Sequence, residues 1–395
     1  MFKNSLYRLI LLIDKIFIYF QYIIIRSYFK KKKTFTLINA GWGQLVQSIF
    51  YLNLLHKKNI SKMIIILDYE KFNLSIENFT KNCKIIKIFS IFIILNKNFS
   101  QYPKNFEIKI KRYCKKIFAN SYEEMDDIIY NKERTFFNKK IISRYLAKKI
   151  SKNKIFSWSL HSLNDHGNHL KKNVFEPNQK TKKKIESTFN LKIRDIKESI
   201  NICVRNRNKS KKNADRTNYL RDGNIDSFKY IINFLLKNYD FRLFLTGDID
   251  DIDINHKNFF TYKKFNKKIS RNFYQLSVQT LSKFHIMNSG GASKIMEFNN
   301  CKFLFIDVWP PINFTINSVL LFKNIFDKKN KYLDSFKYLK MYENNCKKEK
   351  ARNSFKKSKE IFLKFYEAEN YRILNNSKDQ IISSLKEFLI FINKT

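Results

Sequence analysis

The chain has 395 residues, of which 44% are hydrophobic, and this predicts two domains or one large one with an ample core. Its formal charge is +43 (77 basic minus 34 acidic residues), but the basic residues are spread along the whole chain. Lys, Asn, Ile and Phe are abundant throughout, which fits A/T-rich coding as well as selection for a basic patch. No RNA-binding aromatic motif or zinc spacing accompanies the charge, so a specific nucleic-acid role is not favoured, whereas anionic partners such as nucleotide phosphates are.

The five cysteines are odd in number, far apart in the sequence and never arranged as CxxC. Several of them adjoin apolar runs, where a reduced and buried cysteine is common. We therefore expect a reducing, cytoplasmic compartment.

Residues 1–33 are apolar but interrupted by charged and polar side chains, so they lack the about 20 uncharged apolar residues of a membrane-spanning helix. A signal-peptide cleavage site is not evident either. At helical spacing one apolar stripe emerges, followed by the run Lys30–Lys33. This pattern favours docking on an anionic membrane surface; the alternative is a helix packed on the protein's own core. The stripe consists of Leu6, Ile10, Ile13, Phe17, Phe20 and Ile24.

Residues 34–175 alternate apolar runs with helical patterns, which is typical of a parallel sheet. A strand over 34–39 leads through a glycine turn into a helix over 44–57. We expect Gly41 and Gly43 to shape an acceptor or donor cleft; because Val46 replaces the third glycine of a dinucleotide fingerprint, NAD is not predicted. Further strands are expected over 63–67 and 84–89, and helices over 105–118, 122–131 and 137–150.

Residues 156–177 are the expected interdomain region and contain three of the six histidines within nine residues. Their spacing matches no metal-ligand signature. Two interpretations remain: a plain polar loop, which we favour, or a cleft loop in which Asp165 or His166 is a general base.

Residues 176–330 form the second predicted α/β domain, with helices over 179–189, 225–238 and 272–283. A strand over 199–204 runs into Arg205, and another over 241–245 ends at Gly247-Asp248. Ligands of open α/β sheets bind at the carboxyl ends of the strands, where a guanidinium group grips phosphate with paired N–H donors. The alternatives are a surface arginine and an ordinary strand-ending turn.

The stretch 284–307 reads as strand, Gly-rich turn, helix and strand, which is one βαβ unit. Ser289, Gly290 and Gly291 would let a ligand approach the backbone closely, and the start of the following helix would stabilise a diphosphate. Glu297 would accept hydrogen bonds from ribose hydroxyls. The competing interpretation is a tight connection followed by a solvated glutamate. The last segment, 331–395, is charged and predicted to be helical, with helices over 355–368 and 379–393.

The order of motifs over residues 199–310 resembles a family of bacterial GT-B-type glycosyltransferases from surface-polysaccharide gene clusters. That family carries His-Val-Arg-Asp after a strand, then Tyr-Arg-Asn-x-Asp-Ile, Met-Gly-Asp and a Ser-Gly turn. Cys203 stands where the family has His, and Asn206 where it has Asp, so roles for those two groups do not carry over. The matching residues are Arg205, Arg221, Ile225, Gly247, Asp248, Ser289 and Gly290.

The resemblance implies two Rossmann-like domains facing across a cleft, with the acceptor on the first and a nucleotide-diphosphate sugar on the second. It implies metal-independent transfer of a hexosyl or related group to a glycan or lipid-linked acceptor, without a cofactor. The protein would be cytoplasmic, at the inner face of the plasma membrane. Two rival functions stay open: a nucleotide-sugar enzyme such as an epimerase, and a basic, non-enzymatic nucleic-acid-binding or scaffold protein.

Overall fold

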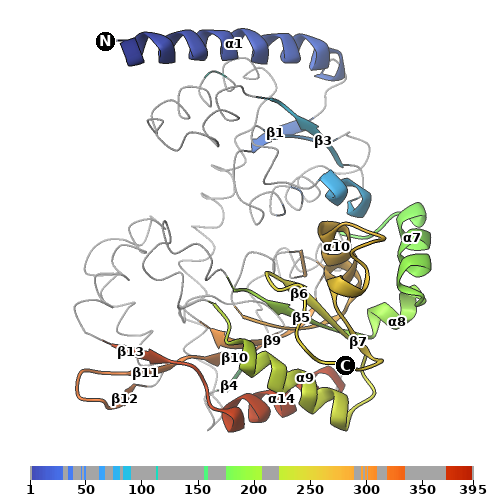
Figure 1. The fold of residues 1–395 in the computed structure, drawn as a ribbon, viewed down its shortest axis with the longest axis vertical. Coiled ribbons are helices and arrows are strands. Elements are labelled where there is room, and N and C mark those ends of the chain that lie inside the picture. The colour runs from blue at the N-terminus through green and yellow to red at the C-terminus, as the bar shows by residue number, and fades with distance from the viewer. Residues whose placement is uncertain are drawn as a thin grey trace. The chain divides into compact units, whose positions relative to one another are not determined.

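A computed structural model of the chain divides into two compact units, residues 1–131 and 132–395 (Figure 1). The structure describes residues 2–29, 34–38, 46, 49, 62–66, 74–80, 83–89, 113, 155–158, 175–206, 222–288, 295–296, 299, 301–308, 318–333 and 371–393. The predicted helices over 105–118, 122–131, 137–150 and 355–368 lie outside these ranges, except for Tyr113.

The first unit combines a long helix with a small parallel sheet. Its elements are α1 (Phe2–Phe29), β1 (Thr34–Ile38), β2 (Lys62–Ile66), the 3-10 helix η2 (Leu74–Phe79) and β3 (Cys83–Lys87). The strands pair in the order β1-β2-β3, all parallel. The predicted strands are confirmed to within one or two residues, because each is a short β-branched run.

The second unit is built on a seven-stranded sheet in the order β4-β10-β9-β8-β5-β6-β7. All neighbours are parallel except β4, which pairs antiparallel with β10 at one edge. The strands are β4 (Ile155–Trp158), β5 (Ile200–Val204), β6 (Leu243–Gly247), β7 (Phe259–Phe260), β8 (Phe284–Met287), β9 (Lys302–Val308) and β10 (Ser318–Phe322).

Helices cover both faces of this sheet (Figure 1). On one face, α9 (Ile225–Asn238) and α14 (Lys378–Asn393) share one apolar core with alternate residues of β5, Ile200, Ile202 and Val204. On the other face lie α7 (Gln179–Phe189), α8 (Ile193–Lys197) and α10 (Arg271–Leu281), and the 3-10 helix η6 (Tyr262–Lys264) lies between β7 and α10 in the chain. The predicted α/β class is therefore confirmed, because strands buried on both faces read as continuous apolar runs.

Two boundaries differ from those predicted. Residues 155–158, expected in the first domain, form β4 in the sheet of the second unit, because they pair with β10. The segment 331–395 is not helical throughout: β12 (Tyr332–Leu333) and β13 (Arg372–Leu374) flank β11 (Asn324–Phe326) in a small antiparallel sheet. These strands of two or three residues are too short to give a recognisable alternation.

The order of the strands has one reversal. From β5 the chain moves outward through α9 to β6 and β7, and then returns through α10 to β8 on the opposite side of β5. The carboxyl ends of β5 and β8 are thus the switch point of the sheet, the position at which open α/β sheets bind ligands.

Candidate functional site

The residues that follow β5 and β8 are joined across the switch point. The backbone N–H of Arg205 donates to Asn288 Oδ1 at 2.8 Å, and Asn288 Nδ2 donates to the Arg205 carbonyl at 3.1 Å. The same carbonyl accepts from the Gly223 N–H at 2.8 Å. Asn288, which is fully buried, therefore fixes the backbone of Arg205 from two sides.

Gly223 lies close beneath this junction. A Cβ at Gly223 would stand 2.6 Å from Phe228 Cε2 and 3.1 Å from the Asn288 amide. A side chain there would displace the ring of Phe228 or the amide that holds Arg205. The glycine thus lets the chain approach the sheet closely immediately before α9. The next residue, Asn224, is the N-cap of α9, and its side chain accepts from the Asp226 N–H at 3.0 Å.

The side chain of Arg205 is paired with Asp222. Its Nε lies 3.5 Å from Asp222 Oδ1, and the two side chains are only 11% and 9% exposed. The carboxylate orients the guanidinium and offsets part of its charge. Arg205 was predicted from its position after a strand, whereas no role was predicted for Asp222.

Gly247 and Asp248 end β6 beside β5. Gly247 has φ +103°, and a Cβ there would lie 2.2 Å from the Val204 carbonyl oxygen, so only glycine fits this backbone. Its own carbonyl accepts from Arg271 Nη2 at 3.1 Å and Gln275 Nε2 at 2.6 Å. Asp248 Oδ2 accepts from the Asn206 N–H at 3.2 Å. Both residues hold the carboxyl ends of β5 and β6 together.

A cavity of about 690 Å³ opens at this same edge of the sheet. Its volume lies within the range of about 300–1,000 Å³ that small-molecule sites occupy. The start of α9 forms one wall, and the segments after β10 and at the end of β13 form another. Its lining residues are Asn206, Asp222, Gly223, Asn224, Ile225, Asp226, Lys323, Ile373, Leu374 and Asn375.

Lys323 is the cation in the wall of this cavity. It follows the carboxyl end of β10, is 5% exposed, and its Nζ donates to Asn375 Oδ1. Burial lowers the pKa of Lys323, while the charges of Asp307 and Asp222 oppose that shift. A desolvated ammonium beside an open cavity is stabilised by an anionic ligand, because its own hydration has already been lost.

Asp307 holds the segment that carries Asn375. It is 1% exposed with φ +50°, a left-handed conformation that Asp tolerates better than most residues. Its Oδ1 accepts from the Asn376 N–H at 2.9 Å and from Asn376 Nδ2 at 2.8 Å. Asp307 thus holds Asn376 in place. Asn376 is next in sequence to Asn375, which accepts the hydrogen bond from Lys323.

Of the predicted site residues, the structure brings three together at the carboxyl edge: Arg205, Gly247 and Asp248. The others lie outside the described residues: Gly41, Gly43, Asp165, His166, Arg221, Ser289, Gly290, Gly291 and Glu297. Sequence reasoning gave no role to Lys323, Asp307 or Asn288. A signal existed for Lys323, since a lysine standing between the apolar runs 319–322 and 325–326 is unusual.

Thiol and metal chemistry have little support in the described part of the chain. The free thiols of Cys203 and Cys301 are buried, and burial raises their pKa to about 11 and about 12, which makes both poor nucleophiles. Among the described residues no group of three His, Cys, Asp or Glu side chains is arranged to hold a metal ion.

No protein-family model and no curated protein matches the chain. Solved structures similar to it include a glycosyl transferase family 9 protein from Veillonella parvula, with 9% identity, TM-score 0.44, and coverage of 91% of this chain and 97% of that one. The E. coli heptosyltransferase WaaC with ADP-2-deoxy-2-fluoro heptose has 10% identity, TM-score 0.38, and coverage of 79% and 99%. E. coli ADP-heptose LPS heptosyltransferase II has 10% identity, TM-score 0.31, and coverage of 79% and 98%. Likenesses at this level assign no role to any residue of this chain.

Proposed function

We propose that the chain is a glycosyltransferase that moves a sugar from a nucleotide-diphosphate sugar to a glycan or lipid-linked acceptor. One observation carries the proposal: a cavity lined by both charged and apolar residues opens at the carboxyl edge of the parallel sheet, between the segments that follow β5 and β10, and this span includes the switch point. Ligands of open α/β folds bind at that position. The family resemblance rests on residues 199–310, and three of its matching residues, Arg205, Gly247 and Asp248, lie at the same edge.

The walls of the cavity suit the two chemically different parts of such a donor. Asp222 and Asp226 are acceptors for sugar or ribose hydroxyls, and Ile373 and Leu374 offer apolar surface to a base. Lys323 is a partner for a phosphate oxygen. Residues 207–221 join two cavity residues, Asn206 and Asp222, and contain six Lys or Arg but one Asp, so that their sequence adds positive charge.

The transfer breaks the bond between the anomeric carbon and the donor phosphate oxygen and forms one to the acceptor oxygen. The electron pair of the broken bond stays on the departing diphosphate, whose added negative charge needs stabilising as it develops. We propose Lys323 and Arg205 for that task, with Arg205 oriented by Asp222. The acceptor hydroxyl loses its proton to a base, for which Asp165 and His166 remain our candidates.

The predicted facing of two domains, with the acceptor on the first, is part of the same proposal. Residues Gly41 and Gly43 would shape the acceptor side, and Arg221 with Ser289–Gly291 and Glu297 would complete the donor side. A role in surface-polysaccharide synthesis, at the inner face of the plasma membrane, is the setting in which a lipid-linked acceptor would be met.

The test is a thermal-shift screen against UDP-, ADP-, GDP- and CMP-linked sugars, with release of the free nucleotide as a second readout. A ligand that binds only the folded state raises the melting temperature. We expect one nucleotide class to give a shift, and Lys323→Ala to reduce it strongly. Lys378→Ala is the matched control, because Lys378 is exposed and lies over the Tyr230 ring, away from the cavity walls.

Two outcomes would overturn the proposal. The first is no shift and no nucleotide release with any donor, together with tight, steeply salt-dependent binding to DNA or heparin, which would favour a basic scaffold protein. The second is conversion of one nucleotide sugar into another without transfer, which would favour an epimerase. An unchanged shift in Lys323→Ala would leave a donor site but remove Lys323 from it.

A further inference from the structure

Helix α1 exposes a continuous apolar surface. Nine large hydrophobic side chains between residues 9 and 24 are between 39% and 73% exposed. They recur three and four residues apart and therefore cover adjoining rows of the helix surface. The nine are Leu9, Leu12, Ile13, Ile16, Phe17, Tyr19, Phe20, Ile23 and Ile24.

The opposite side of α1 is the one that holds it to the first unit. Asp14 and Ile18 are fully buried, and Gln21 exchanges two hydrogen bonds with Phe89, the second residue after β3. Gln21 Nε2 donates to the Phe89 carbonyl at 2.7 Å, and Gln21 Oε1 accepts from the Phe89 N–H at 2.8 Å. These three residues are four and three positions apart, so they form one face.

This arrangement disfavours the alternative interpretation, in which the helix packs its apolar stripe on the protein's own core. Within the described side chains, Ile13, Phe17, Phe20 and Ile24 of the predicted stripe point away from the unit. Among these four, the exposed fraction is lowest at Phe17 (39%) and highest at Ile24 (73%). The helix is thus anchored through the row formed by Asp14, Ile18 and Gln21 and exposes its apolar rows to solvent.

The charges of α1 show which kind of surface would cover these rows. The helix contains four basic residues and a single acidic one, Asp14. Because Asp14 is buried, no carboxylate of α1 is exposed, whereas Arg8 is. The sequence continues directly into Lys30–Lys33. An apolar surface accompanied only by cations complements a bilayer with anionic headgroups.

We infer that the exposed rows of α1 are a docking surface for an anionic lipid bilayer, on which the helix lies in the plane of the interface. At 1.5 Å per residue its 28 residues extend about 42 Å. None of the helices in the described part of the chain is both long and apolar enough to cross a bilayer. The inference concerns the first unit alone and does not depend on the proposed transfer chemistry.

The test is flotation of the full chain with vesicles of phosphatidylcholine alone or mixed with an equal amount of phosphatidylglycerol. We expect binding to the mixed vesicles, weaker binding to the neutral ones, and partial loss at high salt. The double variant Phe20→Glu/Ile24→Glu should bind at least about tenfold less, because it puts two charges into the apolar rows. Ile390→Glu is the control: Ile390 is 52% exposed on α14 of the second unit.

The results distinguish a lipid bilayer from a second copy of the chain as the occupant of the exposed rows of α1. Equal binding of the wild type and the double variant, or no binding to either vesicle, would overturn the inference. So would a dimer in light scattering that the double variant converts to a monomer, since a second copy would then be the occupant. The donor-induced thermal shift, measured without vesicles, should be the same in the double variant, so that failure here leaves the proposed function standing.

Discussion

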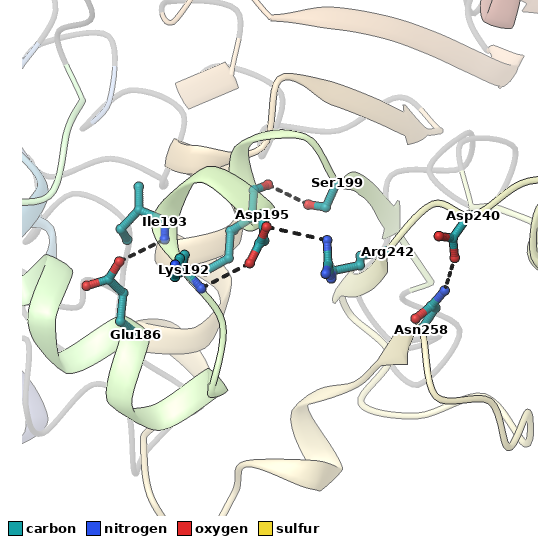
Figure 2. Close-up of polar contacts among 9 residues, drawn as sticks. Glu186, Lys192, Ile193, Asp195, Ser199, Asp240, Arg242 and Asn258 are labelled. Carbon is teal, nitrogen blue, oxygen red and sulfur yellow. Dashed lines mark hydrogen bonds and ion pairs between the residues drawn. The ribbon is translucent and has the colours of Figure 1, made fainter.

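The two ends of the parallel strands in the second unit are both rich in polar contacts, but the contacts differ in kind. At the amino edge, shown in part in Figure 2, the contacts hold the start of a helix or join neighbouring loops: Glu186 accepts from the Ile193 N–H at 2.9 Å, and Asn258 Nδ2 donates to Asp240 at 2.8 Å. At the carboxyl edge, charged groups from distant segments surround a cavity.

The amino edge continues into a neutral network inside the sheet. Ser199 and Ser282 hydroxyls lie 3.0 Å apart, and His285 Nε2 lies 2.9 Å from the Ser282 carbonyl. His285 Nδ1 accepts from Asn201 Nδ2 at 3.0 Å, while Asn201 Oδ1 accepts from Thr246 Oγ1 at 2.8 Å. Every group here has a protein partner, so the network stabilises the fold and leaves nothing for a ligand.

The carboxyl edge instead concentrates charge where a ligand can reach it. Lys323 and Asp222 line the cavity, and Arg205 and Asp307 stand behind them. Burying charges costs stability unless they are well paired, so a cluster of this kind is expected where binding requires it. Substitutions at the amino edge should therefore change stability alone, whereas those at the carboxyl edge should change ligand binding.

The largest expected effect is at Gly247, the residue that joins the two neighbouring strand ends. Gly247→Ala places a Cβ 2.2 Å from the Val204 carbonyl at a φ of +103°. Because the obstacle is backbone, β5 and β6 would have to separate, and we expect a loss of more than about 3 kcal/mol. Circular dichroism melts would show it as a much lower melting temperature or an insoluble protein. An unchanged melt would mean that this edge is not as tightly closed as described.

The second effect tests the neutral state of the amino-edge network. Burial lowers the pKa of His285 from 6.5 to about 3. Below pH 6.5 the unfolded chain therefore binds a proton at His285, whereas the folded chain does not. Stability that is present above pH 6.5 is lost as the pH falls toward 3. At pH 4.5 the loss is about 3 kcal/mol. We expect the wild-type melting temperature to fall more steeply between pH 7 and 4.5 than that of His285→Gln.

One result would contradict the neutral state of His285 in the folded protein. Equal slopes for the wild type and His285→Gln would show that His285 is protonated in the folded protein. The Asn201 amide would then have to present its oxygen to the ring, and the network with Thr246 would be arranged differently.

The third effect separates stability from binding at the carboxyl edge. Arg205→Ala leaves the Asp222 carboxylate, which is 9% exposed, without its guanidinium partner, and should cost about 2 kcal/mol. Arg205→Ala/Asp222→Ala should recover part of that loss, because the buried carboxylate is removed as well. Donor binding, measured as the thermal shift, should not recover. If the double variant bound donor normally, the pair would be a purely structural feature.

The α/β class and the main elements of the second unit followed from its sequence, because buried parallel strands are continuous apolar runs. The helix over 225–238 was predicted with its observed bounds, since Asn224 is a good N-cap and Phe228, Ile231, Ile232 and Leu235 form an inward face. The shift of β6 to 243–247 arose because Gly247, an expected turn residue, is still paired with Val204.

The site was less predictable, because its parts come from segments that nothing in the sequence joins. Arg205 and Asp248 could be found from their places after strands. Lys323 was missed because β10 was not expected, and Asp307 was missed because Asn376, which it holds, is 69 residues further along the chain. On α1 the apolar residues could be identified from the sequence, but the face that turns inward depends on the hydrogen bonds between Gln21 and Phe89.

The smallest expected effects are at the outer rim of the amino edge, around Asp195. Its Oδ2 accepts from the Lys192 N–H at 3.3 Å at the start of α8, and its Oδ1 lies 3.6 Å from Arg242 Nη1 (Figure 2). Asp195→Ala removes a helix cap and should cost about 1 kcal/mol. Arg242→Ala should cost at most about 0.5 kcal/mol, because Arg242 is 39% exposed and water screens the pair. Neither should alter the donor-induced shift. A weaker shift in either variant would mean that the two edges are coupled through β5 and β6, and that the separation of stability from binding fails.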